Sequence, residues 1–359
     1  MQQVLYPRLE INISKLRTNL KVISQLLKKY DISLAMVTKA YCADRNIVLE
    51  LLKDGGVDYL ADSRIENLME FKDIKIPKIL LRIPMISEVS KVVEYADISF
   101  NSEYETVKEL NFEAEKRGDI HSVVLMIDLG DLREGYFDEK DLFESVEKIA
   151  KLKNIDIVGI ATNLTCYGAI LPSEVNLRKL VELGTRIERE YKIDLKIISG
   201  GNSSSLFLLS EGKIPKGINN LRIGEGILLG RETAYGQRLD GTYDDAFRLI
   251  CEVIENKRKE SLPIGEQGVD AFGERHIYVD RGPMQRVILG IGKQDIKVES
   301  LIPTNKKIEV IGASSDHTIV DITNSQKRYL IGDKIEFILN YSGIMSASTS
   351  KYVKRFYIE

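Results

Sequence analysis

The stretch LAMVTKAYCADR, Leu34–Arg45, determines how the rest of this chain is interpreted. Its first five residues, Leu34–Thr38, are mostly apolar and predict a buried strand that ends at Lys39. A charged side chain is costly in a core, so a lysine at the end of such a strand needs an explanation. Either its ammonium extends to solvent at the strand end, or its amine is desolvated and forms a Schiff base with an aldehyde.

The composition is typical of a soluble globular protein with two domains. The chain has 359 residues, 43% hydrophobic and 29% charged, and a typical domain has ~150 residues. The net charge of -3 and the lack of a basic stripe give no indication of nucleic-acid binding. No apolar run approaches the ~20 residues of a membrane helix, and the opening MQQVLYPRLE contains no apolar signal core. We therefore expect a cytoplasmic protein without a nucleic-acid or membrane partner.

The cysteines and histidines argue against a metal site. The three cysteines, Cys42, Cys166 and Cys251, have no metal-like spacing and are too few for a disulfide scaffold. The three histidines are scattered along the chain, so the sequence predicts no histidine-rich metal site.

Strand-like segments alternate with amphipathic helical segments over the first two thirds of the chain. The eight expected strands are Leu34–Thr38, Val57–Asp62, Lys78–Ile83, Asp97–Phe100, Val123–Asp128, Ile155–Thr162, Leu195–Ser199 and Asn220–Ile223. Strict alternation predicts a parallel sheet. Eight units over about 220 residues fit a closed (β/α)8 TIM-type barrel better than an open doubly wound sheet, which stays the alternative.

The pattern changes after Gly230, where a polar linker, Glu232–Asp245, leads into strands separated by turn residues. These strand-like segments are Phe247–Glu255, His276–Val279, Arg286–Ile291, Lys307–Ile311, Thr318–Ile322 and Lys334–Leu339. We therefore expect the barrel over residues 12–232 and a C-terminal all-β domain over residues 233–359. A strand within residues 1–11 is expected to join the β domain.

A barrel of this kind carries its chemistry at the C-terminal ends of its strands and binds phosphate at the loops after strands seven and eight. Lys39 ends the first strand, and those two loops are the glycine-rich segments Ser199–Ser205 and Arg222–Gly226. Glycines allow close backbone approach and hydroxyls donate hydrogen bonds, although such a loop alone is more often a simple turn. Lysine, phosphate loops and arginine at one barrel mouth predict an aldehyde-bearing phosphate cofactor, pyridoxal 5'-phosphate (PLP), with Arg222 facing its pyridine nitrogen.

With these motifs the chain resembles the fold-type III PLP enzymes of the alanine racemase class. Within the alanine/ornithine racemase group it is most similar to the ornithine racemase branch, and the resemblance covers nearly the whole chain. The resemblance implies a PLP-dependent racemase that interconverts L- and D-ornithine through an external aldimine, with removal and return of the Cα proton. Lys39 then carries the Schiff base and serves one face of the substrate. A head-to-tail homodimer is implied, in which one subunit's barrel and the partner's β domain build each site.

The same resemblance implies which barrel residues contact the cofactor. Arg222 and the Gly224-Glu225 pair match contacts to the ring nitrogen and the phosphate. Asn202-Ser203 match a pair after strand seven whose serine binds the phosphate.

Two further cofactor contacts are implied outside those loops. Arg133, in an Arg-x-Gly turn after strand five, matches an arginine that contacts the ring hydroxyl and the substrate carboxylate. Tyr341, in Leu-Asn-Tyr-Ser-Gly, matches a tyrosine that reaches the phosphate.

The chain departs from alanine racemases at the group that serves the second face. Those enzymes carry a tyrosine in a Gly-Tyr-x-Asp motif, whereas this chain has Gly292-Lys293-Gln294-Asp295. Lys293 is therefore the first candidate for the second base, and a solvated turn lysine is an equal reading. Ser315, Asp316 and His317 are the next candidates. Because the matching segment of alanine racemases lies beside the substrate carboxylate, Ser315 and Asp316 are also expected to contact substrate.

A second departure concerns Asn163, where a histidine is common in the family. Asn163 is expected near the cofactor ring, where it either holds Arg222 by a hydrogen bond or is a plain strand-end residue. The second ammonium of a diamino acid would need a carboxylate, and Asp131, Glu134 and Asp316 are conceivable partners. A surface or structural role is the favoured interpretation of each of these acids.

Other functions remain open alternatives at this stage. The substrate could be lysine or alanine, or the scaffold could support another PLP reaction such as decarboxylation or aldol cleavage. A non-enzymatic PLP carrier is disfavoured, because relatives of that kind end soon after strand eight and this chain continues for a whole further domain.

Overall fold

The computed structural model describes residues 5–359 and divides them into two compact units. Lys15–Asp244 form the first unit, and Asp245–Glu359 form the second together with the described residues up to Ser14. Part of the expected N-terminal segment, residues 1–4, lies outside the described residues. In the described range no helix is long and apolar enough to cross a bilayer.

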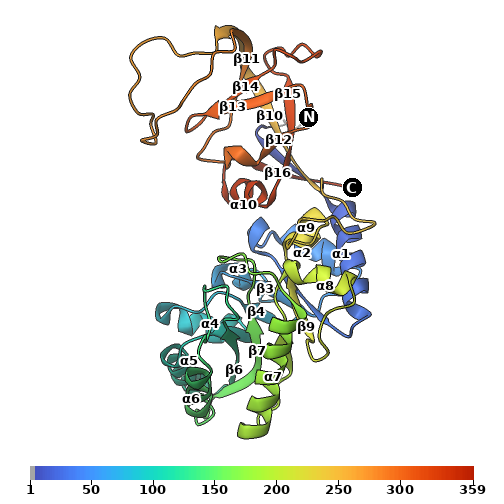
Figure 1. Ribbon diagram of the computed structural model, residues 1–359, viewed down its shortest axis with the longest axis vertical. Helices are drawn as coiled ribbons and strands as arrows, with labels where there is room; N and C mark the ends of the chain where they lie inside the picture. The colour runs from blue at the N-terminus through green and yellow to red at the C-terminus, as the bar shows by residue number, and fades with distance from the viewer. Residues whose placement is uncertain (1–4) are drawn as a thin grey trace. The chain divides into compact units, whose positions relative to one another are not determined.

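Eight parallel strands close into a barrel in the first unit (Figure 1). They are β2 (Ser33–Val37), β3 (Tyr59–Asp62), β4 (Lys78–Leu80), β5 (Ile98–Asn101), β6 (His121–Ile127), β7 (Ile155–Thr162), β8 (Ile197–Ser199) and β9 (Asn220–Ile223). Each strand pairs with the next, and β9 pairs with β2 with Leu221 opposite Leu34, which closes the ring. The expected (β/α)8 barrel is confirmed, and the open sheet is excluded.

The barrel interior is filled by apolar side chains from successive strands. One buried cluster consists of Ala35, Ala61, Ile79, Ile98, Phe100, Val124, Met126, Val158, Ala161 and Ile197. Removing a large apolar side chain from water contributes ~1.5–3 kcal/mol. Strands that are buried on both faces show continuous apolar runs rather than alternation, which is why five consecutive residues of β6, Val123–Ile127, are all buried. The interior is therefore a packed core, and polar groups gather where the strands end.

Helices separate the barrel strands, as alternation predicted. They are α1 (Ile13–Lys28), α2 (Arg45–Leu52), α3 (Ile65–Met69), α4 (Val89–Tyr95), α5 (Tyr104–Arg117), α6 (Glu139–Ile149), α7 (Glu174–Tyr191), α8 (Leu206–Ser210) and α9 (Glu225–Leu229). Short 3-10 helices lie at Lys39–Tyr41, Ile86–Glu88 and Ser203–Ser205. Two of these follow β2 and β8, so the chain turns tightly where the expected site residues lie.

The segment expected as a polar linker, Glu232–Asp245, belongs to the barrel unit up to Asp244. Glu232 is buried, and its carboxylate accepts hydrogen bonds from the backbone N–H groups of Ala234, Tyr235 and Gln237. The buried hydroxyl of Thr242 donates to the carbonyl of Gly230. These contacts explain why the division between the units falls after Asp244.

The second unit is an antiparallel sheet with strand order β12-β15-β10-β11-β14-β13. Its strands are β10 (Phe247–Glu260), β11 (Pro283–Leu289), β12 (Leu301–Pro303), β13 (Glu309–Ala313), β14 (Thr318–Asp321) and β15 (Lys334–Leu339), and one helix, α10 (Tyr341–Thr349), follows β15. A 3-10 turn lies at Val298–Ser300. β1 (Arg8–Asn12) pairs antiparallel with β10 and parallel with β16 (Lys354–Ile358).

A long excursion, residues 261–282, leaves this sheet between β10 and β11; we call it the arm (Figure 1, the long loop at upper left). The strand expected at His276–Val279 is wrong, because this part of the arm is irregular. Its apolar residues follow the pattern of a strand in the sequence, but Ile277 is 97% exposed. A strand needs a neighbouring backbone to pair with, and an apolar run alone does not provide one.

Candidate functional site

Five neighbouring strands bring the expected site residues of the barrel to one end. Around the ring the order is β6, β7, β8, β9 and β2. Parallel strands end on the same side, so the loops after these strands are neighbours. The approach is closest between β9 and β2, where a Cβ on Gly224 would lie 3.2 Å from the Cβ of Val37. Lys39, two residues beyond Val37, therefore lies next to the Arg222–Gly224 segment.

Lys39 opens the 3-10 turn that follows β2. Its side chain is half-buried, and within residues 5–359 its Nζ has no hydrogen-bond or ion-pair partner. Cys42 and Ala43 adopt left-handed backbone angles, φ 51° and 50°, which is uncommon for residues other than glycine. The N–H of Cys42 donates to the carbonyl of Lys39 at 3.2 Å. This tight reversal holds an unpaired amine at the strand end.

Asp62, at the end of β3, supports the turn and was missed by the sequence analysis. Its buried carboxylate accepts from Thr38 Oγ1 at 2.6 Å, the N–H of Arg64 at 2.9 Å and Asn67 Nδ2 at 3.0 Å. Burial raises the pKa of Asp62 above its ordinary value. The available signal was an acid that ends an apolar strand. Since its oxygens are occupied, Asp62 fixes the residue that precedes Lys39.

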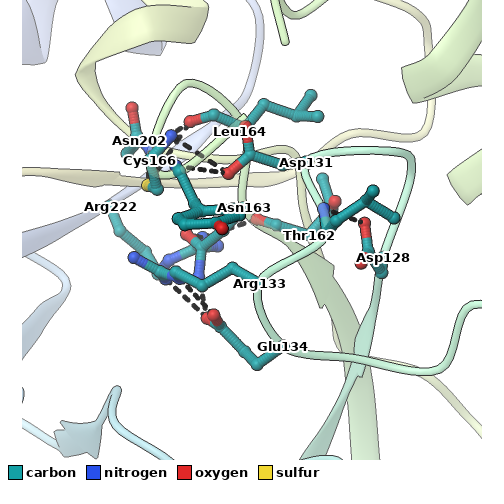
Figure 2. Close-up of polar contacts among 12 residues, drawn as sticks. Asp128, Asp131, Arg133, Glu134, Thr162, Asn163, Leu164, Cys166, Asn202 and Arg222 are labelled. Atoms are coloured by element: carbon teal, nitrogen blue, oxygen red, sulfur yellow. Dashed lines mark hydrogen bonds and ion pairs between the residues drawn. The ribbon is translucent and has the colours of Figure 1, made fainter. Parts of the chain in front are cut away.

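Arg222 lies on β9 and is only 3% exposed. Its Nη1 donates to Ser199 Oγ at 2.6 Å. Its Nη2 donates to the carbonyl of Thr162 and to Asn163 Oδ1, both at 2.6 Å (Figure 2). Its guanidinium also lies 5.2 Å from the centre of the Phe100 ring. Burial lowers the pKa of Arg222 to about 10, so the group stays charged at neutral pH.

Asn163 connects Arg222 to the loop after β6. Of the two readings left open for this residue, the structure contains the hydrogen bond to Arg222. The Asn163 side chain also donates from Nδ2 to Glu134 Oε1 at 2.5 Å. Glu134 in turn forms an ion pair with Arg133, accepting from its Nε and, at 2.5 Å, from its Nη2 (Figure 2). Arg133 and Arg222 therefore belong to one hydrogen-bonded network.

The loop after β8 carries the expected phosphate residues. Gly201 has φ +112°, and a Cβ there would lie 2.8 Å from Ser205 Oγ, so this close turn favours glycine. Asn202 caps the 3-10 turn by accepting from the N–H of Ser204 at 2.8 Å. Ser203 Oγ accepts from the N–H of Gly226 at 3.0 Å, which joins the two expected phosphate loops. In the part of the chain that the structure describes, the buried hydroxyl of Ser204 has no hydrogen-bond partner.

Glu225 does not present a free carboxylate. Its Oε1 accepts from Arg231 Nε at 3.1 Å and from Nη2 at 2.7 Å. A phosphate would in any case repel this side chain. Its backbone, together with that of Gly224, is the part that could face the phosphate of a cofactor.

Asp131 is a structural acid, although it was considered as a partner for a substrate ammonium. It is 1% exposed. Its carboxylate accepts the backbone N–H groups of Cys166 at 3.1 Å, Tyr167 at 2.8 Å and Ile170 at 3.2 Å. Through these hydrogen bonds Asp131 connects the loop after β7 to the loop after β6. Its two oxygens are occupied, as are those of Glu134.

The remaining site residues from the sequence lie in the second unit. Lys293 and Ser315 belong to adjoining segments, because the N–H of Lys293 donates to the carbonyl of Ser314 at 2.9 Å and the N–H of Gln294 donates to that of Ser315 at 3.0 Å. The Lys293 ammonium lies 3.8 Å from both Asp270 Oδ2 and Glu274 Oε2 of the arm.

Asp316 and Tyr341 complete this set. Asp316 Oδ1 lies 2.9 Å from His317 Nδ1. Tyr341 is the first residue of α10, after the N-cap residue Asn340, whose side chain accepts from the N–H of Gly343.

The groups at the barrel mouth fit an aldehyde-bearing phosphate such as PLP. An aldehyde requires an amine without a counter-ion, which Lys39 provides. A phosphate requires hydroxyl and amide donors near a glycine turn, and the loop that holds Ser203 and the unpaired Ser204 hydroxyl provides them. A charged donor for the ring is available in Arg222.

The sequence can be compared with known proteins. A family model, described as the alanine racemase N-terminal domain, matches residues 11–231. The chain is 50% identical to a protein named ornithine racemase from Acetoanaerobium sticklandii. The alignment spans 351 residues and covers 98% of this chain and 99% of that protein. The chain is 37% identical over 356 residues to a protein named lysine racemase from Thermotoga maritima, with 99% of each chain covered.

The fold can be compared with solved structures. An alanine racemase from Clostridium difficile 630 superposes with a TM-score of 0.75 at 22% identity over 99% of this chain and 97% of that chain. An alanine racemase from Bartonella henselae, described with covalently bound pyridoxal phosphate, gives a TM-score of 0.75 at 18% identity over 99% of this chain and 100% of that chain. At such identities these structures show a common fold. The family match spans the barrel and the sequence relatives span both units, so this chain belongs to the alanine racemase family.

Proposed function

We propose that this protein is a PLP-dependent amino-acid racemase that interconverts L- and D-ornithine. The observation that carries the proposal is Lys39, whose half-buried amine has no partner among the described residues and lies at a barrel mouth beside a buried arginine. The relative named ornithine racemase, 50% identical over nearly the full length, supports ornithine as the substrate.

The barrel residues divide the task of holding PLP. Ser203, with the backbone of Gly224 and Glu225, would hold the phosphate, and Asn202 would keep the loop in place. Arg222 would donate a hydrogen bond to the pyridine nitrogen, and Asn163 would orient it. Tyr341 of the β domain is proposed as a further phosphate contact. When bound, PLP supplies an electrophilic carbon for the amino group and withdraws electrons from Cα, which acidifies the Cα–H.

The protein residues then move and hold the proton. Once an amino acid has displaced it, the Lys39 amine is free to remove or return a proton on one face of Cα. Arg222 donates a hydrogen bond but gives up no proton readily, because a guanidinium with a pKa of about 10 remains charged at neutral pH. Arg133 would bind the substrate carboxylate, since its fork of N–H groups matches carboxylate geometry.

A racemase needs a second group on the opposite face, and we propose Lys293 for it. The Lys293 side chain is ion-paired with Asp270 and Glu274, and it would hold or return the proton on that face. Ser315 and Asp316, whose segment adjoins Lys293, are proposed as substrate contacts. Because the family builds its site from two subunits, we propose a head-to-tail homodimer in which the partner's β domain supplies these residues. We propose a reducing, cytoplasmic location, because no cysteine within residues 5–359 forms a disulfide.

Lysine is the second candidate substrate, supported by the 37% identical relative named lysine racemase. Lysine is one methylene longer than ornithine, and a single methylene in a binding pocket is worth only ~1–3 kcal/mol of discrimination. Activity on both amino acids with a preference for ornithine is therefore the expected result.

The deciding experiment is proton NMR of the PLP-loaded protein in deuterated water, with L-ornithine, L-lysine and L-alanine offered separately. We expect exchange of the Cα proton of ornithine, with D-ornithine accumulating by chiral chromatography. A carrier would bind PLP and exchange none of the three. Release of carbon dioxide or an aldehyde instead of the D-isomer would identify a decarboxylase or an aldolase.

A further inference from the structure

We propose that Glu134 is a positioning residue that ties Arg133 to Arg222 and leaves one edge of Arg133 open for an amino acid's carboxylate. The inference rests on the proposed function, because it gives Arg133 the substrate carboxylate as its ligand. Three features of the barrel mouth carry it: the charge balance, the edges of the Arg133 guanidinium, and the direction of the Asn163 amide.

The charge balance singles out Glu134. The three acceptors of the Arg222 guanidinium, Ser199 Oγ, the Thr162 carbonyl and Asn163 Oδ1, are all neutral. The carboxylate that balances its charge is Glu134, which is connected to Arg222 through Asn163, because Asn163 Nδ2 donates to Glu134 Oε1. The same Oε1 accepts from Arg133 Nη2. One carboxylate therefore stands between two guanidinium groups that would otherwise repel each other at close range.

The edges of Arg133 show why this pairing does not block substrate. Glu134 takes the Nε and Nη2 side of the guanidinium. Within residues 5–359, Nη1 of Arg133 has no partner, and the side chain is 41% exposed. A second carboxylate can therefore bind end-on, through Nη1 and the remaining N–H of Nη2. Glu134 fixes the plane of the guanidinium and thereby the direction of the open edge.

The Asn163 amide connects Glu134 to Arg222, so the position of Glu134 also restrains the Arg222 guanidinium. Its oxygen accepts from Arg222 and its nitrogen donates to Glu134, so the two contacts together fix which way the amide points. An amide has no proton to lose near neutral pH. The link between the two arginines should therefore keep its direction.

Backbone hydrogen bonds and a glycine turn hold the loop after β6 in the conformation that positions Glu134. The N–H of Tyr136 donates to the carbonyl of Met126 at 2.8 Å, and the N–H of Asp128 donates to that of Tyr136 at 3.0 Å, so the loop closes on its own strand. Gly135 has φ +122°, and a Cβ there would lie 2.7 Å from the N atom of Asp128. Only glycine suits this position, and the turn places Arg133 and Glu134 just before it.

The test uses the PLP-loaded protein and propionate, a carboxylate without an amino group. Propionate binding is measured by calorimetry, PLP affinity by titration of the apoprotein, and KM and kcat with L-ornithine. The variants are Glu134→Gln and Asn163→Ala. The control is Glu174→Gln, which removes a half-exposed carboxylate that is paired with Arg178 on the surface of α7.

We expect Glu134→Gln to raise the propionate Kd and the ornithine KM by about tenfold, with a smaller change in kcat. Asn163→Ala keeps the Arg133–Glu134 pair, so it should leave propionate binding within about twofold and weaken PLP affinity instead. The control should change none of these. If Glu134→Gln fails to fold, Glu134→Asp keeps the charge, shortens the reach and should give an intermediate rise in both constants.

Tighter propionate binding by Glu134→Gln would make Glu134 a competitor for the open edge and overturn the proposal. Unchanged binding, or no propionate binding by the wild-type protein, would overturn it as well. The propionate measurement needs no turnover. If it behaves as expected while no amino acid is racemised, the proposed function fails and the positioning role stands.

Discussion

Lys39 and Arg222 are two cations of the same barrel mouth that are held in opposite ways. Lys39 is half-buried without a partner among the described residues, whereas Arg222 is almost wholly buried and donates three hydrogen bonds. An amine without a counter-ion is available to react. A buried guanidinium that donates hydrogen bonds to three acceptors is fixed in place. Each residue type therefore suits the role proposed for it.

Replacing Lys39 tests the reacting group. Borohydride reduction of the PLP-loaded wild-type protein should leave the pyridoxyl group on the peptide that contains Lys39. Lys39→Ala should lose that label and about a thousandfold in kcat/KM, because no other amine takes its place. Peptide mapping by mass spectrometry and the racemase assay provide the readouts. Lys53→Ala, at a 57% exposed lysine paired with Glu50, is the control and should keep both. A wild-type label on a different lysine would contradict the assignment.

At the scale of elements, the loops of the barrel mouth are cross-linked by side chains rather than by regular structure. Asp131 joins the loops after β6 and β7, and Ser203 joins those after β8 and β9. Thr165 and Ala169, in the loop that Asp131 pins, have φ 59° and 55°. Left-handed conformations of such residues persist only where the surroundings impose them.

Asp131→Asn should release this loop. The amide keeps one acceptor oxygen and turns an N–H₂ toward backbone donors, so at least one backbone N–H of the loop loses its partner. We expect a loss of about 2 kcal/mol in the free energy of unfolding. Hydrogen exchange should accelerate in residues 164–170, as read by mass spectrometry alongside urea unfolding. Asp156→Asn, at an exposed acid of β7, is the matched control. Equal exchange in both variants would show that the loop holds its shape without Asp131.

Lys293 contacts the arm of the second unit through three of its side chains. Its ammonium lies 3.8 Å from Asp270 and Glu274 and 4.0 Å from the centre of the Phe272 ring, and all three belong to the arm. Ion pairs and cation–π contacts of a partly buried lysine are individually modest, at about 0.5–1 kcal/mol each. Together they give the arm a fixed point on a sheet from which it otherwise departs.

Lys293→Met should therefore loosen the arm, and tryptic cleavage after Arg275 should become several-fold faster. If Lys293 is also the second base, the variant should slow Cα exchange of one ornithine enantiomer far more than that of the other. Lys306→Met removes an exposed lysine of the same domain and should change neither quantity. Faster cleavage with equal, small effects on both enantiomers would leave Lys293 as an anchor of the arm and remove it as a base.

At the scale of the whole molecule, acid stability depends on a buried histidine far from the expected chemistry. His121 opens β6, is 3% exposed, and its Nε2 lies 2.8 Å from Ser99 Oγ. Burial lowers the pKa of His121 to about 4. Between pH 6.5 and pH 4 this histidine is protonated in the unfolded chain but not in the folded protein. The free energy of unfolding therefore falls as the pH falls through this window.

The shift corresponds to a loss of up to about 3 kcal/mol across that window. His121→Gln should lack this component, so the difference in unfolding free energy between wild type and variant should shrink as the pH falls from 6.5 to 4. Urea unfolding followed by circular dichroism at several pH values measures it. His317→Gln, at a partly exposed histidine, is the control. A difference that stays constant with pH would mean that His121 is protonated in the folded protein.

Much of the architecture follows from local pattern. Apolar runs of four to eight residues between amphipathic segments specify the parallel barrel, because strands buried on both faces are mostly apolar along their length. The expected strands after residue 33 match the observed barrel strands closely. The same reasoning fails at His276–Val279, where an apolar run belongs to the arm and lacks a pairing partner.

The sequence by itself determined the barrel, the lysine that ends its first strand and the glycine-rich loops, because each is a property of a short stretch and its period. Only the tertiary structure decided which acids are structural and how the arginines are linked. Glu134, Asn163 and Arg222 come from three loops or strands, and their hydrogen bonds depend on how the closed barrel brings those strand ends together. No local pattern encodes that geometry, since a side-chain contact forms at the end of folding, when backbones distant in sequence have already met.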